Sequence, residues 1–125
     1  MLEMKGCSKV LVTGGAGFIG SHLVDRLMAE GFGVCVLDDF SAGRMENVSH
    51  HIGVRGFHLV RGDVRDVGLV EKVVEGVDVV FHLAALVDVA LSIENPVLFD
   101  EVNVVGTLNL LRACLGSDVK RFVFA

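Results

Sequence analysis

The stretch KVLVTGGAGFIG, residues 9–20, decides the fold expected for this chain. Its first five residues form an apolar run, which is typical of a central parallel strand covered on both faces. A glycine-rich turn follows, and from Phe18 onward apolar residues recur at helical spacing as far as Gly31, which acts as a helix stop. The stretch therefore predicts a strand, a tight turn and a helix in direct succession.

Strand and helix patterns alternate along the rest of the chain. Further strands are expected at residues 33–37, 57–60, 78–82 and 121–125, and helices at 44–51 (short and weak), 67–75 and 96–115. The last helix has a clear start, because Asn is favoured at the N-cap and Pro at the first helical position, as in Asn95-Pro96. This alternation predicts an α/β fold: a Rossmann-type doubly wound parallel sheet of about five strands.

Composition narrows the class of protein. With 125 residues and 52% hydrophobic content, the chain suits one globular domain. The net charge of −5 and scattered Lys and Arg argue against a nucleic-acid partner. No apolar run is long enough for a membrane span, so we expect no membrane contact. The three cysteines, an odd number without metal-like spacing, favour a reducing, cytoplasmic compartment.

The glycine turn has the features of a dinucleotide-binding loop. Glycines let the backbone approach a pyrophosphate closely, and the positive end of the following helix meets the negative charge. Gly20 allows the helix to lie close to the sheet. Asp38, at the end of the second strand, is placed to accept hydrogen bonds from ribose hydroxyls and to repel a 2′-phosphate. Asp38 favours NAD over NADP, although Arg44 lies nearby in the sequence and could accept the 2′-phosphate of NADP. The alternative for the glycine turn itself is a tight turn that binds no ligand.

Five segments resemble the extended short-chain dehydrogenase/reductases, in the NAD-dependent epimerase/dehydratase family. They are TGGAGFIGSHL (13–23), LDDFSAGR (37–44), GDVRD (62–66), FHLAA (81–85) and ENPVLFDEVNVVGTLNLL (94–111). Within the family, the sequences of these segments are most similar to those of the UDP-glucose 4-epimerase branch. Members of that branch hold NAD and transfer a hydride reversibly at the sugar C4. The resemblance implies one NAD-binding Rossmann half-domain over residues 1–125, truncated before the second half and lacking the substrate domain.

The resemblance also implies a set of cofactor-binding residues. They are Gly14, Gly17, Phe18, Ile19 and Gly20 at the pyrophosphate, Asp38, Asp39, Ser41 and Gly43 at the adenosine ribose, Asp63 and Val64 at the adenine, and Leu83, Ala84, Ala85 and Asn103 toward the nicotinamide ribose. Asp63 would otherwise cap its loop, and Asn103 would otherwise bond protein backbone. His82 is expected to be a satisfied core histidine. His50, His51 and His58 hint at a metal, but their spacing is not diagnostic, and no metal is expected.

The chain departs from the family's pattern in the catalytic residues. The family uses a Ser or Thr with a Tyr-x-x-x-Lys pair, and this sequence contains no Tyr. We therefore expect no catalytic residue here, and a sugar-nucleotide substrate only for a full-length enzyme. Because the chain stops within its last strand, we expect a fragment. A stand-alone NAD-binding or interaction module is the alternative, and a SAM- or flavin-binding domain is disfavoured.

The long helix carries two apolar stripes. One stripe is expected to pack on the sheet, and the other, which runs from Val97 to Leu115, is in excess of what a sheet-packed helix needs. Family members often dimerise through this helix, so we expect a homo-oligomer, a dimer through the helix at residues 96–115. The alternative is that the second stripe packs on chain absent from this sequence.

Overall fold

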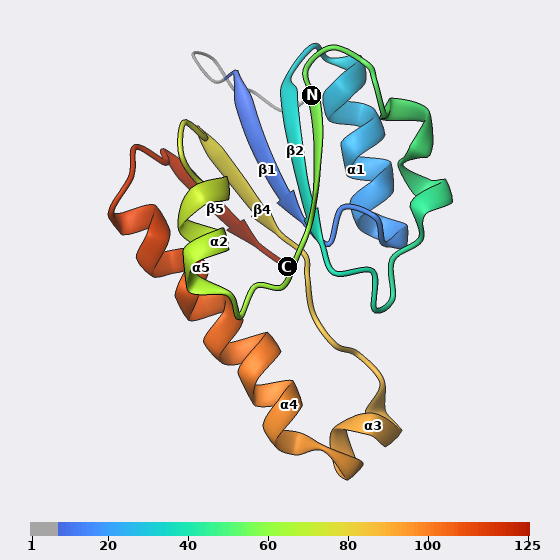
Figure 1. The fold of residues 1–125 in the computed structure, drawn as a ribbon, viewed down its shortest axis with the longest axis vertical. Helices are drawn as coiled ribbons and strands as arrows, with labels where there is room; N and C mark the ends of the chain where they lie inside the picture. The colour runs from blue at the N-terminus through green and yellow to red at the C-terminus, as the bar shows by residue number, and fades with distance from the viewer. Residues whose placement is uncertain (1–7) are drawn as a thin grey trace.

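The computed structural model describes residues 8–125 as a five-stranded sheet with helices on both faces (Figure 1). The strands are β1 (Lys9–Thr13), β2 (Gly33–Asp38), β3 (Phe57–Arg61), β4 (Val79–His82) and β5 (Arg121–Phe124). The α-helices are α1 (Phe18–Ala29), α2 (Val67–Val73), α3 (Val89–Glu94), α4 (Pro96–Asp100) and α5 (Gly106–Leu115). Two 3-10 turns, η1 (Met45–Asn47) and η2 (Ser49–His51), and a π-helical turn, η3 (Glu101–Val105), complete the fold.

The sheet is parallel throughout, with strand order β3-β2-β1-β4-β5. The central strand β1 pairs with β2 on one side and with β4 on the other, so that Val12 lies between Val36 and Phe81. The chain thus reverses its direction of travel across the sheet after β3. In such sheets ligands bind where the order switches, outside the carboxyl ends of the strands. The predicted doubly wound architecture is confirmed.

Two hydrophobic cores lie on opposite faces of the sheet. Successive strand residues point to opposite faces, so Val10 and Val12 pack under α1, whereas Leu11 packs under α2 and α5. All three side chains are fully buried, and each contributes about 1.5–3 kcal/mol through burial. Because both faces of the inner strands β1, β2 and β4 are covered, these strands read in the sequence as nearly continuous apolar runs.

The long helix expected over residues 96–115 differs from the prediction. Asn95 caps its start as predicted, accepting a hydrogen bond of 3.2 Å from the Leu98 amide. The helix then passes from α4 through the π-helical turn η3 into α5, with the side chain of Val102 buried at the turn. A π turn adds one residue to the helical period and is frequent at functional sites. The weak helix at 44–51 is two 3-10 turns, and α3 is an addition to the predicted elements.

The two apolar stripes of this helix have different surroundings. Gly106 and Leu110, on the first stripe, are buried against the sheet. The second stripe is exposed and consists of Val97, Val104, Leu108, Leu111 and Leu115. No helix within residues 8–125 is long and apolar enough to cross a membrane.

Candidate functional site

A crevice opens at the carboxyl ends of the strands, where the strand order switches. It is lined by residues that follow each of the four strands β1 to β4. Eleven residues of the predicted cofactor set line it: Gly14, Gly17, Asp38, Asp39, Ser41, Gly43, Asp63, Val64, Leu83, Ala84 and Ala85. The other four, Phe18, Ile19, Gly20 and Asn103, lie outside the lining. Segments far apart in the sequence thus meet at one edge of the sheet.

The glycine turn after β1 is shaped by close backbone contacts. Gly14 has a φ of +70°, and a Cβ there would lie 2.8 Å from the Ala84 nitrogen. A Cβ on Gly20 would overlap the Gly14 carbonyl oxygen. Glycine is therefore required at both positions by the protein itself, because a side chain would collide with backbone.

Gly17 differs from these two glycines. It is the N-cap of α1, with an ordinary φ of −76°. A Cβ built on it would meet a single residue within 4 Å, the Gly14 carbonyl oxygen at 3.2 Å. A methyl group at Gly17, which lines the crevice, therefore requires the Gly14 oxygen to shift by only a few tenths of an ångström, a far smaller disturbance than at Gly14 or Gly20. The bare Cα there is suited to the close approach of a ligand.

The first turn of α1 begins beside the crevice, directly after Gly17, which lines it. The Ser21 N–H donates to the Gly17 oxygen at 2.9 Å and so begins the helical ladder. The N–H groups of Phe18, Ile19 and Gly20 precede that bond and are available to an external acceptor. Phe18 and Ile19 are 80% and 71% exposed, and their side chains do not line the crevice. This arrangement suits a phosphate.

Asp38 braces the glycine turn against the end of β2. Its Oδ2 accepts the Ala16 N–H at 3.0 Å, and its Oδ1 accepts the Phe40 N–H at 2.9 Å. The residue is buried, and Gly43 passes so close that a Cβ there would lie 2.8 Å from Oδ2. Each carboxylate oxygen keeps further acceptor capacity for a ligand hydroxyl. The sequence did not reveal that Asp38 also holds the turn.

Asp39 and Asp63 are engaged within their own loops. Asp39 Oδ1 accepts from the Ser41 N–H and hydroxyl at 2.9 and 2.7 Å. Asp63 accepts from the Arg65 backbone N–H at 2.9 Å and from its guanidinium at 2.6 Å. The Arg65 hydrogen bonds lower the pKa of Asp63 despite its partial burial. Arg65 also reaches Glu101 at 3.4 Å, a pairing across 36 positions that no sequence motif marks. The loop-capping alternative for Asp63 thus has a geometric basis, and its adenine contact stays a prediction.

A buried hydrogen-bond chain supports the floor of the crevice. The Thr13 hydroxyl oxygen accepts the N–H groups of Leu83 and Ala84, both at 3.1 Å. The same oxygen lies 2.6 Å from Nδ1 of His82. Since Thr13 already accepts two bonds, its hydroxyl donates to Nδ1, which makes Nδ1 an acceptor.

The chain continues from the other ring nitrogen of His82. Its Nε2 lies 2.8 Å from the Thr107 hydroxyl, which in turn donates to the Asn103 carbonyl at 2.7 Å. Nε2 therefore carries the proton, and the neutral ring is satisfied at both nitrogens. Burial lowers the pKa of His82 to about 4. The predicted role of His82 as a satisfied core histidine is confirmed.

Asn103 fixes the loop that follows β4. Its Oδ1 accepts the Leu86 N–H at 2.8 Å, and its Nδ2 donates to the Leu86 carbonyl at 3.0 Å. Protein backbone is therefore its partner, which is the alternative that the sequence left open. Its role toward a nicotinamide ribose stays a prediction.

Comparison with known proteins identifies the family. The model of the NAD dependent epimerase/dehydratase family matches residues 10–125. The chain belongs to this family. This is the family that the sequence resemblance predicted. The relatives include proteins named UDP-glucose 4-epimerase and proteins named UDP-glucuronic acid decarboxylase.

The relatives are much longer than this family member. UDP-glucuronic acid decarboxylase 2 of Arabidopsis thaliana is 50% identical over 88% of this chain and 23% of its own length. UDP-glucose 4-epimerase of Mycolicibacterium smegmatis is 45% identical over 92% of this chain and 37% of its own length. The chain thus spans less than two fifths of these relatives.

Solved structures agree with the fold of this family member. UDP-glucose 4-epimerase of Thermotoga maritima with UDP-glucose matches with a TM-score of 0.85 and 39% identity, over 93% of this chain and 37% of that one. UDP-glucose 4-epimerase of Thermus thermophilus in complex with NAD has a TM-score of 0.74 and 48% identity, over 85% and 33% of the two chains.

Proposed function

We propose that this chain binds NAD in the crevice and forms the cofactor-binding half-domain of a nucleotide-sugar epimerase or dehydratase. The observation that carries the proposal is the placement of a helix N-terminus with unengaged amides beside a buried carboxylate at the switch point of the sheet. The pyrophosphate would meet the amides of Phe18, Ile19 and Gly20, over the bare Cα of Gly17.

The remaining predicted contacts follow from that placement. The adenosine ribose would bond Asp38, with Asp39, Ser41 and Gly43 closing the same side of the crevice. The adenine would lie by Asp63 and Val64. The nicotinamide side would extend along the backbone of Leu83–Ala85, which the Thr13 and Asn103 hydrogen bonds hold in place.

The chemistry would be hydride transfer at C4 of a UDP-sugar, as in the 4-epimerases, and it requires groups outside this chain. A base is needed for the sugar hydroxyl, and the family's Tyr is missing from these 125 residues. We therefore assign cofactor binding and orientation to this chain, and proton transfer to other residues of a longer enzyme. The absence of Tyr equally suits the alternative, a non-catalytic NAD-binding module. An open reading frame that continues beyond codon 125 and encodes Tyr-x-x-x-Lys would exclude this alternative.

We also propose a homodimer and a cytoplasmic location. The exposed stripe of the α4–α5 helix supports the first, because exposed apolar side chains in one line mark an interaction surface. The free thiols of Cys35 and Cys114 fit a reducing compartment and so support the second.

Calorimetric titration with NAD and NADP tests the cofactor assignment. NAD should bind more tightly, because a 2′-phosphate would lie against the Asp38 carboxylate. Asp38→Asn should weaken NAD binding about tenfold and reduce the preference for NAD, since it removes the charge and one acceptor.

Asp118→Asn is the matched control, because Asp118 is an exposed carboxylate that does not line the crevice. It should leave the NAD preference in place. Melting curves of both variants separate loss of binding from loss of fold. Tighter binding of NADP than of NAD by the unaltered chain would refute the assignment.

A further inference from the structure

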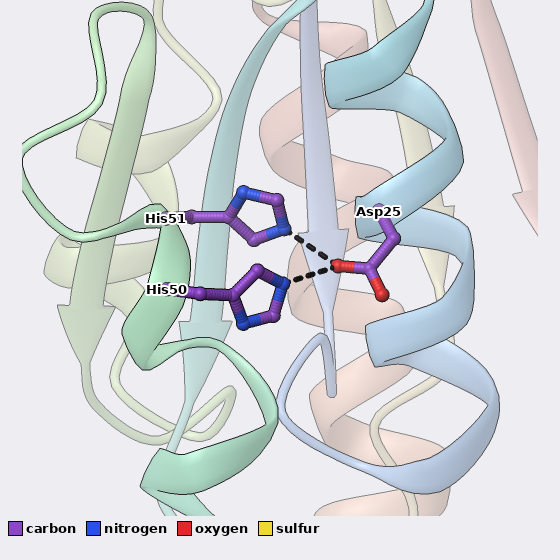
Figure 2. A group of neighbouring side chains, drawn as sticks. All are labelled: Asp25, His50 and His51. Carbon is purple, nitrogen blue, oxygen red and sulfur yellow. Dashed lines mark hydrogen bonds and ion pairs between the residues drawn. The ribbon is translucent and has the colours of Figure 1, made fainter.

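Three side chains with metal-binding chemistry meet outside the residues that line the crevice. Asp25 comes from α1, and His50 and His51 come from η2 (Figure 2). The Nε2 atoms of His50 and His51 lie 2.8 and 2.6 Å from the same carboxylate oxygen, Oδ1 of Asp25. The cluster differs from the one that the sequence hinted at, because His58 lies exposed on β3 and takes no part.

Packing holds both imidazoles toward the carboxylate. His51 has a side chain only 12% exposed, and its ring lies 5.3 Å from the Phe57 ring. The His50 ring lies 4.0 Å from the His51 ring, which brings two neighbouring residues to one point. A pair of histidines that is already oriented loses little conformational freedom on binding a ligand.

We propose that Asp25, His50 and His51 form a binding site for a divalent transition-metal ion of the zinc class. Their ligand atoms all lie within 4.8 Å of one another. Zinc binds imidazole nitrogen and carboxylate oxygen at about 2.0–2.2 Å, which sets tetrahedral ligand atoms about 3.3 Å apart. The nitrogens must therefore retreat from Oδ1 by roughly half an ångström. Each imidazole would bind the ion in its neutral form through Nε2 with its proton on Nδ1, and any additional proton would be released to solvent.

The donor set decides which ions fit. Two nitrogens and one carboxylate oxygen suit Zn²⁺, Co²⁺ and Ni²⁺, whereas Mg²⁺ and Ca²⁺ prefer oxygen ligands. The side chains of His50 and Asp25 are 54% and 50% exposed, so solvent reaches the cluster. Water can therefore complete the coordination of an ion held by three protein ligands.

A bound ion would connect two parts of the cofactor-binding architecture. It would fasten η2 to α1, and the segment just before η2 is already bonded to the glycine turn. The Asn47 amide and the Arg44 N–H donate to the Ala16 carbonyl at 2.7 and 3.0 Å. Occupation of the site would thus steady the loop that closes the ribose side of the crevice.

Titration of the chelator-treated chain with Co²⁺, followed by Zn²⁺ competition, tests the proposal without NAD. We expect one Co²⁺ per chain, visible d–d absorption without the near-ultraviolet band of a thiolate ligand, and displacement by Zn²⁺. Saturating Zn²⁺ should raise the melting temperature by about 5 °C, as expected for a ligand that binds the folded state.

His50→Asn and Asp25→Asn each remove a ligand and should weaken Co²⁺ binding at least about tenfold. His58→Asn is the matched control and should bind Co²⁺ as tightly as the unaltered chain does. His22→Asn is a second control, on the same helix as Asp25, and should also leave Co²⁺ binding unchanged. Melting curves without metal show whether each variant folds. The proposal is overturned if the unaltered chain binds no Co²⁺, if a thiolate band dominates, or if folded ligand variants bind as tightly as the controls.

Discussion

Acidification should destabilise the chain through His82. The ring is fully buried, and both its nitrogens are bonded in the neutral form, to Thr13 and Thr107. A second ring proton would have to face a Thr13 hydroxyl that already donates to Nδ1. Burial lowers the pKa of His82 to about 4 from an ordinary value of 6.5. The folded state therefore resists the protonation that the unfolded state accepts.

The size of the effect follows from the two pKa values. Below pH 6.5 the unfolded chain binds more protons at this site, so stability falls as the pH falls and levels off near pH 4. At 1.36 kcal/mol per pH unit, the loss from His82 reaches about 3 kcal/mol. For a domain of this size that is a large share of the whole stability.

Urea unfolding at about pH 7.5 and about pH 4.5 measures the loss. Other groups titrate over the same pH range, so we compare the free energy of unfolding of the unaltered chain with that of His82→Asn. The Asn side chain cannot be protonated, and the difference between the two free energies therefore isolates His82. That difference should shrink toward acid pH by roughly 2–3 kcal/mol. A difference that does not change with pH would show that His82 has the same pKa in the folded and the unfolded chain. The buried hydrogen-bond chain described above would then be wrong.

Two further predictions concern packing. Gly20→Ala should lower the free energy of unfolding by about 3 kcal/mol, because its Cβ would overlap the Gly14 carbonyl. The control Gly68→Ala would bring its Cβ only into ordinary contact with Asp66 Oδ1 at 3.8 Å, and it should be neutral within about 1 kcal/mol in the same urea assay. Leu108→Glu combined with Leu111→Glu should convert the proposed dimer to a monomer in light scattering, because it places charges on the exposed stripe; a monomer before substitution would contradict the dimer.

The sequence predicted the sheet well because its three inner strands, β1, β2 and β4, are buried on both faces. Val10–Val12 and Val34–Val36 must be apolar on both sides, and this leaves a pattern that flanking glycines delimit. The strand bounds differ from the predicted ones by only one residue at a few ends. Each inner strand appears in the sequence as a short apolar run, and such a run can be recognised without knowledge of distant contacts.

The features that escaped prediction depend on contacts between distant segments. The π turn η3 leaves apolar periodicity almost unchanged, so residues 96–115 read as one α-helix. The partners of Asp38 are backbone groups, which carry no residue signature, and for the same reason the sequence left open whether Asn103 bonds backbone or ligand. Asp25 and His50 are 25 positions apart, and only the placement of η2 beside α1 brings them together.

Gly17 offers the most direct test of cofactor binding in the crevice. A Cβ at this position would meet one neighbour, the Gly14 oxygen at 3.2 Å, and it would stand in the path of a pyrophosphate bound over the α1 N-terminus. Calorimetric titration of Gly17→Ala with NAD should therefore show an affinity at least about tenfold weaker, while a separate melting curve shows that the variant is folded at the titration temperature. An unchanged NAD affinity in the folded variant would contradict the central claim, because the dinucleotide would then bind elsewhere.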